Sequence, residues 1–407
     1  MASTSCNRLA EELLDCCLRG QPRPAHLLRT LIGEECSPAF FGTVIEGLGD
    51  RFEPRLCRVY AELFAEALEG ALPEFRARDL VERYERVRRP RRFEGDAERV
   101  EKVFVLSRVT LGADVAVTSV MLDAARRRFP NARIFLVGSL KSWEMFAGDP
   151  RIAHAPLPYP RRGSLSERLA SWQELKAMLS QPASITIDPD SRLTQLGLLP
   201  VCPEEDYFFF ESRGYGGDGG DPLPVLARRW AAETLGAPDA VPFLAPASSI
   251  GPQDRPFAAV SLGVGENPAK RIPDPFEEEL LRMLLRLGYA VLIDKGAGGE
   301  ETERVERAVA NCDSGDGRIF TWQGAFAPFA GAIARSRLYV GYDSAGQHVA
   351  AACGVPLLTV FAGFVSERMF QRWRPWGRGP IQVLRVEDRD PEAVLARARE
   401  AIGKLLK

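Results

Sequence analysis

Residues 339–363 constrain the fold most, because they combine a strand, a tight turn, a helix and a second strand. The apolar run that ends at Gly341 and the run Leu357–Phe361 have the composition of buried strands. A polar turn at 343–346 and a helix of small residues at 347–353 separate the two runs, and a Gly-Val-Pro sequence ends the helix. This order of elements is typical of a parallel α/β sheet.

The turn at 343–346 is where we expect an anion to bind. Backbone N–H groups at the start of a helix lack partners within the helix, and the helix dipole favours negative charge there. Ala345 and Gly346 carry almost no side chain, so a ligand can approach the backbone closely. The alternative is an ordinary βα turn in which Ser344 caps the helix.

Length and charge limit the classes of protein to which the chain can belong. Its 407 residues suffice for two or three domains, and its net charge of −2 gives no general attraction to nucleic acid. Neither a membrane-spanning apolar run nor a signal peptide is recognisable, so we predict a cytoplasmic protein. The basic stretch 86–92 is predicted as a solvated linker, with peripheral attachment to the inner face of the membrane as the alternative.

Cysteine and histidine usage argues against a metal site. Five of the eight cysteines lie in the first 57 residues without zinc-like spacing, and the chain has three histidines. We therefore predict buried structural thiols and no bound metal.

The order of segments predicts the domain plan. Apolar residues recur at helical spacing throughout 1–95, which predicts an all-helical N-terminal segment. Strand-like runs then alternate with helices over 96–247 and again over 248–407. The predicted fold class is α/β, with two doubly wound Rossmann-like domains that face a cleft. Ligands of such sheets bind at the carboxyl ends of the strands, so the turns near Asp114 and Lys270 should face the cleft.

Two further segments give specific expectations. A capping box formed by Ser164 and Glu167 predicts one helix over 164–181. The glycine-rich stretch 213–224 is predicted as a mobile loop, because the Lys or Ser that opens a helix in a phosphate cradle is missing. A G-x-G-x-x-G sequence is also missing after the first strand of each domain, which argues against a nicotinamide enzyme.

Three separated motifs carry a resemblance to a known family. They are RVTLGADV at 108–115, SLGVGENPAKRIP at 261–273 and DSAGQH at 343–348, the last followed by VAAACGVP. In order and spacing they resemble the bacterial heptosyltransferases of lipopolysaccharide biosynthesis, glycosyltransferase family 9, over about residues 100–407. The resemblance implies the GT-B fold, with 96–247 as the acceptor-side domain and 248–407 as the nucleotide-sugar-binding domain. It does not cover the N-terminal helices.

The resemblance also implies an activity. It is the inverting, metal-independent transfer of a heptose-like sugar from a nucleotide-diphosphate donor, with an ADP-sugar favoured, to a hydroxyl of a glycolipid or saccharide acceptor, without a cofactor. Such a displacement needs a base on one side and charge stabilisation on the other. The family motifs assign the base to Asp114 and the diphosphate-binding cation to Lys270.

Further family positions surround the expected donor. Backbone groups of Ser344, Ala345 and Gly346 would bind the diphosphate, and Asp343 would position their loop. His348 would lie near the donor. Glu300 would accept the ribose hydroxyls, with Glu301 equally well placed, and Gln323 would lie near the base.

Departures from the family pattern keep two alternatives open. Ala113 and Ala345 stand where the family has glycine, which motivates a non-catalytic, nucleotide-sugar-binding scaffold. The uncovered N-terminal helices motivate a protein-modifying GT-B glycosyltransferase, in which they bind a protein partner.

Overall fold

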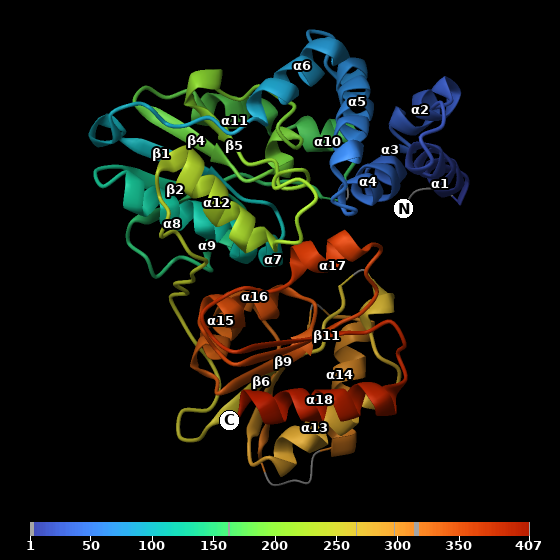
Figure 1. Cartoon of the computed structure of the whole chain (residues 1–407), viewed down its shortest axis with the longest axis vertical. Helices are drawn as coiled ribbons and strands as arrows, with labels where there is room; N and C mark the ends of the chain where they lie inside the picture. Colours follow the sequence, from blue (N-terminus) through green and yellow to red (C-terminus); the bar gives the residue numbers. More distant parts are fainter. Residues whose placement is uncertain (1–3, 162, 266, 297, 313–316, 407) are drawn as a thin grey trace.

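The computed structural model describes residues 4–161, 163–265, 267–296, 298–312 and 317–406. Its core consists of two all-parallel β-sheets, one above the other in Figure 1, with helices packed against them. The predicted α/β class with two doubly wound domains is therefore confirmed, whereas the boundaries at 95 and 247 stay predictions. None of the helices in these ranges combines the length and apolar character that a bilayer crossing requires.

The first sheet has five strands in the order β3-β2-β1-β4-β5. The central strand β1 has a continuous apolar sequence because both faces of a parallel sheet are covered. The strands are β1 (Lys102–Leu106), β2 (Arg133–Gly138), β3 (Ile152–Pro156), β4 (Ser184–Asp188) and β5 (Tyr207–Phe209). The helices that follow β1 are α7 (Leu111–Ala113), the π-helical segment η3 (Asp114–Thr118) and α8 (Ser119–Arg128). Helix α9 (Leu140–Trp143) follows β2, and α12 (Leu223–Leu235) follows β5.

The second sheet has six strands in the order β11-β10-β9-β6-β7-β8. Its strands are β6 (Phe257–Ser261), β7 (Ala290–Asp294), β8 (Ile319–Trp322), β9 (Leu338–Tyr342), β10 (Leu357–Phe361) and β11 (Ile381–Arg385). Its helices are the 3-10 turn η6 (Pro268–Lys270), α13 (Phe276–Arg286), α14 (Glu300–Cys312), α15 (Phe326–Arg335), α16 (Ala345–Ala352), α17 (Glu367–Trp373) and α18 (Pro391–Leu405). Ligands of parallel sheets bind at the turns that follow the carboxyl ends of the strands, so these turns are the candidate site in both domains.

The N-terminal helices form a layer on the first sheet. Leu13, Phe41 and Leu63 lie in one hydrophobic cluster with Phe104 and Leu106 of β1, so the layer shares a core with the sheet. Its helices are α1 (Thr4–Leu18), α2 (Ala25–Ile32), α3 (Ser37–Ala39), η1 (Phe40–Ile45), α4 (Glu46–Gly49), α5 (Pro54–Ala71) and α6 (Ala77–Val87). The predicted all-helical segment is thus confirmed, and it packs as part of the first domain (Figure 1).

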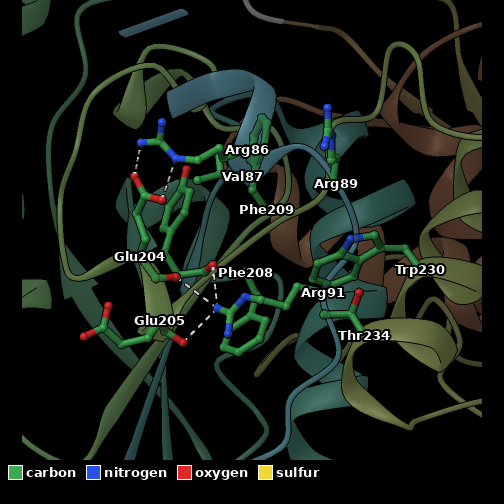
Figure 2. Close-up of a pocket in the computed structure, with 11 residues that line it drawn as sticks. Arg86, Val87, Arg89, Arg91, Glu204, Glu205, Phe208, Phe209, Trp230 and Thr234 are labelled. Atoms are coloured by element: carbon green, nitrogen blue, oxygen red, sulfur yellow. Dashed lines mark hydrogen bonds and ion pairs between the residues drawn. The ribbon is translucent and has the colours of Figure 1, made fainter. Parts of the chain in front are cut away.

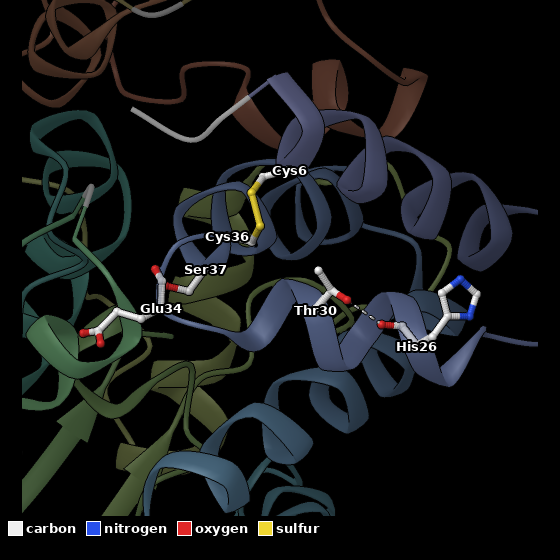
Figure 3. Close-up of a disulfide and its surroundings, with 6 residues drawn as sticks. All are labelled: Cys6, His26, Thr30, Glu34, Cys36 and Ser37. Carbon is white, nitrogen blue, oxygen red and sulfur yellow. Dashed lines mark hydrogen bonds between the residues drawn. A yellow bond between two sulfur atoms is a disulfide. The ribbon is translucent and has the colours of Figure 1, made fainter.

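Three local expectations are corrected. The predicted helix over 164–181 is two helices, α10 (Leu165–Leu169) and α11 (Trp172–Leu179), because Ser171 leaves the helical conformation and lets Trp172 pack into the core. The capping box itself is present. The prediction of buried thiols is corrected for Cys6 and Cys36. The two residues form a disulfide with Cα atoms 5.2 Å apart, which ties α1 to the turn before α3 (Figure 3).

The glycine-rich loop, predicted to be mobile, is held by arginines in α17 and directly after it. Arg372 donates to the carbonyl of Asp221 at 2.8 Å, and Arg374 donates to that of Gly220 at 2.8 Å. Arg368 donates to the carbonyl of Gly217 at 2.6 Å and to that of Phe52 at 2.6 Å. These contacts connect α17 to the first domain and to its N-terminal layer.

Candidate active site

The turn after β1 is built around a buried carboxylate. Asp114 is fully buried, and its Oδ2 accepts a hydrogen bond from Ser107 Oγ at 2.8 Å. Its Oδ1 accepts from Arg108 N at 2.7 Å and from Thr118 Oγ1 at 2.8 Å. Val109, a β-branched residue, has a strained φ of +72°, and its N–H donates to Ser107 Oγ at 2.9 Å. The carboxylate therefore holds a strained turn in place.

The surroundings of Asp114 have opposite effects on its acidity. Burial raises the pKa of Asp114, because the charged carboxylate is removed from water. Hydrogen bonds from Ser142, Ser107 and the Arg108 N–H partly offset this rise in pKa. The structure places Asp114 at the carboxyl end of β1, as predicted, with the carboxylate turned into the protein.

The second turn brings together Lys270 and Asp343, which are far apart in sequence. Lys270 Nζ donates to Asp343 Oδ2 at 2.7 Å and to the Asp343 carbonyl at 3.1 Å. Gln347 Nε2, one turn into α16, donates to Asp343 Oδ1. The Lys270 side chain is 18% exposed. An ammonium group has three N–H donors, so one donor remains for a ligand on the exposed side.

His348 is buried beside this cluster. It is 4% exposed, its Nε2 lies 3.3 Å from Gln347 Nε2, and its ring centroid lies 5.9 Å from that of Trp373. Burial lowers the pKa of His348 to about 4, Asp343 opposes this effect, and Lys270 adds to it. The imidazole is therefore neutral at pH 7. Within the described ranges, its Nδ1 has no hydrogen-bond partner.

The start of α16 approaches the turn after β1. Ser344 makes no side-chain cap to the helix, contrary to the alternative of an ordinary capped turn. A Cβ on Gly112 would lie 3.5 Å from Ala345 Cα and 3.7 Å from His348 Cδ2, so the two turns are in close contact. A Cβ on Gly346 would lie 2.2 Å from the hydroxyl of the buried Tyr339, so only glycine fits there.

The remaining predicted donor residues are not brought to this cluster equally. Glu301 Oε1 accepts from Val264 N at 3.1 Å, next to the carboxyl end of β6. Glu300 is exposed at the start of α14, and Gln323 is exposed after β8. Of the two competing glutamates, Glu301 is the one tied to the loop that leads to Lys270. Across the described residues, no group of His, Cys, Asp or Glu side chains could hold a metal ion.

A cavity of about 190 Å³ adjoins the turn after β1 and was missed by sequence reasoning. The motif RVTLGADV contains Arg108, but the family resemblance implies no role for this residue. Asp190 and Trp373 lie in none of the three motifs. The sequence signal for Arg108 is its place at the head of the RVTLGADV motif. The cavity lining includes Arg108, Thr110, Ala113, Asp190, Arg213 and Trp373.

A second cavity, of about 340 Å³, lies on the basic stretch 86–92 (Figure 2). Arg86 Nη2 bonds Glu204 at 2.9 Å, Arg88 Nη2 bonds Glu211 at 3.1 Å, and Arg91 donates to backbone carbonyls. These arginines are therefore paired within the protein. The other two arginines of the stretch, Arg89 and Arg92, are exposed, and the solvated linker stays a prediction.

Two all-parallel sheets that meet through the turns at their strands' carboxyl ends define the GT-B class of fold. Residues 231–398, which contain most of the second sheet and its helices, match the family model described as glycosyltransferase family 9 (heptosyltransferase). The resemblance predicted from the motifs is thereby confirmed.

Comparisons with individual proteins agree with this assignment. A stretch of 95 residues, 23% of this chain, is 28% identical to lipopolysaccharide heptosyltransferase 3 of Escherichia coli and spans 27% of that protein's length. The structure of the Escherichia coli heptosyltransferase WaaC with ADP-2-deoxy-2-fluoro heptose superposes with a TM-score of 0.54 at 16% identity, covering 74% of this chain and 99% of that one. The family 9 glycosyl transferase of Veillonella parvula gives 0.53 at 17% identity, with 75% and 90% covered. These structures share the GT-B fold with this chain.

Proposed function

We propose that this protein is an inverting, metal-independent glycosyltransferase of lipopolysaccharide biosynthesis. It transfers a heptose-like sugar from a nucleotide-diphosphate donor, with ADP favoured, to a hydroxyl of a glycolipid or saccharide. The observation that carries this proposal is the Lys270–Asp343–Gln347 cluster at the start of α16, opposite the turn that holds Asp114.

In this proposal the cluster binds the donor diphosphate. Asp343 fixes the direction of the Lys270 ammonium, whose third N–H donates to a phosphate oxygen. Backbone N–H groups at Ser344, Ala345 and Gly346 add the positive end of the α16 dipole. Negative charge grows on the diphosphate as the bond to the anomeric carbon breaks, so these groups stabilise the transition state more than the bound donor.

The other donor contacts follow from position. Glu301, already tied to the loop before Lys270, accepts the ribose hydroxyls, and Glu300 is the competing candidate. Neutral His348 lies beside the donor and supports its position without adding charge. Gln323 lies near the nucleobase as the most peripheral of the proposed contacts.

Asp114 acts as the base. The acceptor hydroxyl gives its proton to the carboxylate, and the acceptor oxygen forms a bond to the anomeric carbon. The bond between that carbon and the diphosphate oxygen breaks on the opposite face, with both electrons leaving on the diphosphate. Because Asp114 is fully buried in this structure, acceptor binding must rearrange the turn so that the hydroxyl reaches the carboxylate.

The burial of Asp114 also favours one competing function, a nucleotide-sugar-binding scaffold without transfer. Both proposals predict donor binding, but only the enzyme turns over. Incubation with ADP-heptose and a lipopolysaccharide core saccharide, with release of ADP as the readout, separates them. Binding without release, under conditions in which the protein stays folded, would establish the scaffold.

Calorimetric titration with ADP, GDP, UDP and TDP tests the donor site first. We expect micromolar binding of one nucleotide, ADP, and a loss of at least tenfold in Lys270→Ala, because a charge-assisted hydrogen bond to phosphate contributes about 1.5–3 kcal/mol. Lys404→Ala is the matched control, since Lys404 is exposed on α18 and pairs with Glu400. Absence of binding by all four nucleotides would refute the donor site.

A further inference from the structure

We propose that the 190 Å³ cavity beside the turn after β1 is the acceptor pocket, and that it binds an oxyanionic group of the acceptor against Arg108 and Arg213. The N-terminal helical layer forms one wall of this pocket. This inference rests on the proposed glycosyl transfer and specifies the class of acceptor.

Three separate parts of the chain build the cavity. Glu46, Asp50 and Phe52 come from the N-terminal layer, and Trp373 comes from the end of α17 in the second domain. The remaining lining residues follow strands β1, β3, β4 and β5 of the first sheet, Arg108, Thr110, Ala113, Asp190, Arg192 and Arg213 among them. The cavity thus lies at the carboxyl edge of the sheet, where parallel sheets bind ligands.

Two buried guanidinium groups in the cavity share a single carboxylate. Arg213 Nη1 pairs with Asp190 Oδ2, and Arg108 Nη2 lies 3.8 Å from the same oxygen. Arg108 is 7% exposed and Arg213 is 8% exposed. Within the described part of the chain, Arg108 Nη1 and Arg213 Nε have no hydrogen-bond partner. Buried donors without acceptors are unfavourable, and an oxyanion supplies the missing acceptors.

The charge balance of the lining points the same way. Arg192 is paired with Glu46, which leaves Arg108 and Arg213 with the carboxyl groups of Asp50 and Asp190. Burial lowers the pKa of Arg108 to about 10, with Asp190 opposing, so its cation is incompletely compensated. Burial also raises the pKa of Asp50, with Arg213 opposing, which weakens one of the compensating negative charges.

The position of the cavity suits an acceptor. The Arg108 guanidinium carbon lies 6.0 Å from the Trp373 ring centroid, and the Trp373 ring lies 5.9 Å from that of His348 beside the donor turn. Ala113, next to the proposed base, also lines the cavity. Its small volume and charged lining suit a single charged sugar group, not an acyl chain.

The N-terminal wall is fixed to the rest of the site. Arg368 Nε donates to the Phe52 carbonyl at 2.6 Å, and Ser366 Oγ donates to the Arg51 carbonyl at 3.4 Å. On the other side, Arg192 Nη2 bonds Glu46 at 2.6 Å. The wall residues come from the N-terminal helical layer and lie outside the segment that matches the family model.

The test measures the binding of inorganic phosphate to the full-length protein saturated with ADP, which fills the diphosphate site. We expect one equivalent of phosphate to bind, with affinity at least tenfold weaker in Arg108→Gln and closer to wild type in Arg108→Lys. Arg78→Gln is the control, because Arg78 is an exposed residue of α6 paired with Glu82. Affinity that is unchanged in Arg108→Gln, or an absence of phosphate binding, overturns the inference.

Two further arms distinguish the source of the anion. Glucose 1-phosphate that binds in calorimetry with the same dependence on Arg108 supports a soluble sugar phosphate. Co-sedimentation with phosphatidylcholine vesicles containing phosphatidic acid, again lost in Arg108→Gln, supports a lipid-linked acceptor. If ADP binds to wild type and neither anion source does, the pocket assignment fails while the donor site stands. If ADP does not bind either, the proposed function fails as well.

Discussion

The turns after β1 and β9 each hold a buried aspartate, and the two carboxylates are compensated in opposite ways. Asp114 is fully buried, and hydroxyl and backbone donors from its own turn and helix satisfy it. Asp343 is 7% exposed and bonds the ammonium of Lys270, which comes from a different turn of the second domain. The first carboxylate holds backbone in place, and the second holds a cation at the edge of a ligand site.

This difference separates stability from binding. Loss of Asp114 leaves several buried donors without an acceptor, and each such donor is expensive. Loss of Lys270 leaves a carboxylate that still has Gln347 as a donor. The first turn should therefore respond to mutation mainly in its stability, and the second mainly in ligand affinity.

Replacement of Asp114 by Ala should have the largest effect on stability. Three donors, from Ser107, Arg108 and Thr118, lose their acceptor, at about 1–3 kcal/mol each. We expect the free energy of unfolding in urea to fall by about 3 kcal/mol or more. Asp114→Asn keeps one acceptor oxygen and should lose less. A loss below about 1 kcal/mol in Asp114→Ala would show that the turn does not depend on the carboxylate.

The second largest effect is expected in the pH dependence of stability. His348 has a folded pKa of about 4 against an ordinary value of 6.5, so the unfolded chain binds its proton first as pH falls. Stability should therefore decrease between pH 6.5 and 4, by about 3 kcal/mol from this group in total.

Urea unfolding of wild type and His348→Gln across this range isolates that contribution. The comparison with His348→Gln is needed because Asp188 has the opposite effect on stability. Burial raises the pKa of Asp188 to about 6, so protonation of Asp188 favours the folded state as the pH falls. Parallel pH profiles for the two proteins would contradict the buried, neutral state of His348.

The sequence predicted the elements whose apolar pattern is continuous. Strands β1 and β10 are runs of buried residues, and both lie close to their predicted ranges. The edge strands β3 and β11 were missed, because half-buried positions interrupt their apolar pattern. The helix break at Ser171 was missed for a different reason, since burial of Trp172 is a tertiary effect that a local capping signal does not contain.

The site was predictable in part for similar reasons. Motif order placed Asp114 and Lys270 on the turns that face each other, but the pairing of Lys270 with Asp343 depends on how two distant turns meet. The cavity could not be predicted, because its walls come from three parts of the chain. Its N-terminal wall, near Asp50, lies outside every family motif.

A smaller effect is expected from crowding in the second turn. In Gly346→Ala, the new methyl group would lie 2.2 Å from the Tyr339 hydroxyl, and the buried ring has little room to move. We expect a loss of about 1–3 kcal/mol in stability. Tyr339→Phe removes the hydroxyl, so the double variant should recover part of this loss. Equal stability of the single and double Gly346 variants would place the strain elsewhere.

The smallest effect on stability should come from the ion pair that dominates the donor site. The Lys270 side chain is 18% exposed, so we expect Lys270→Met to lose about 1 kcal/mol of unfolding free energy, much less than Asp114→Ala. A double-mutant cycle with Asp343→Asn should give a coupling energy of similar size. The same Lys270→Met variant should nevertheless lose at least tenfold in ADP affinity, because it lacks the ammonium group whose third N–H donates to the diphosphate in the proposed complex. A stability loss as large as that of Asp114→Ala, with ADP affinity unchanged, would mean that both turns use their charged residues only to hold the fold.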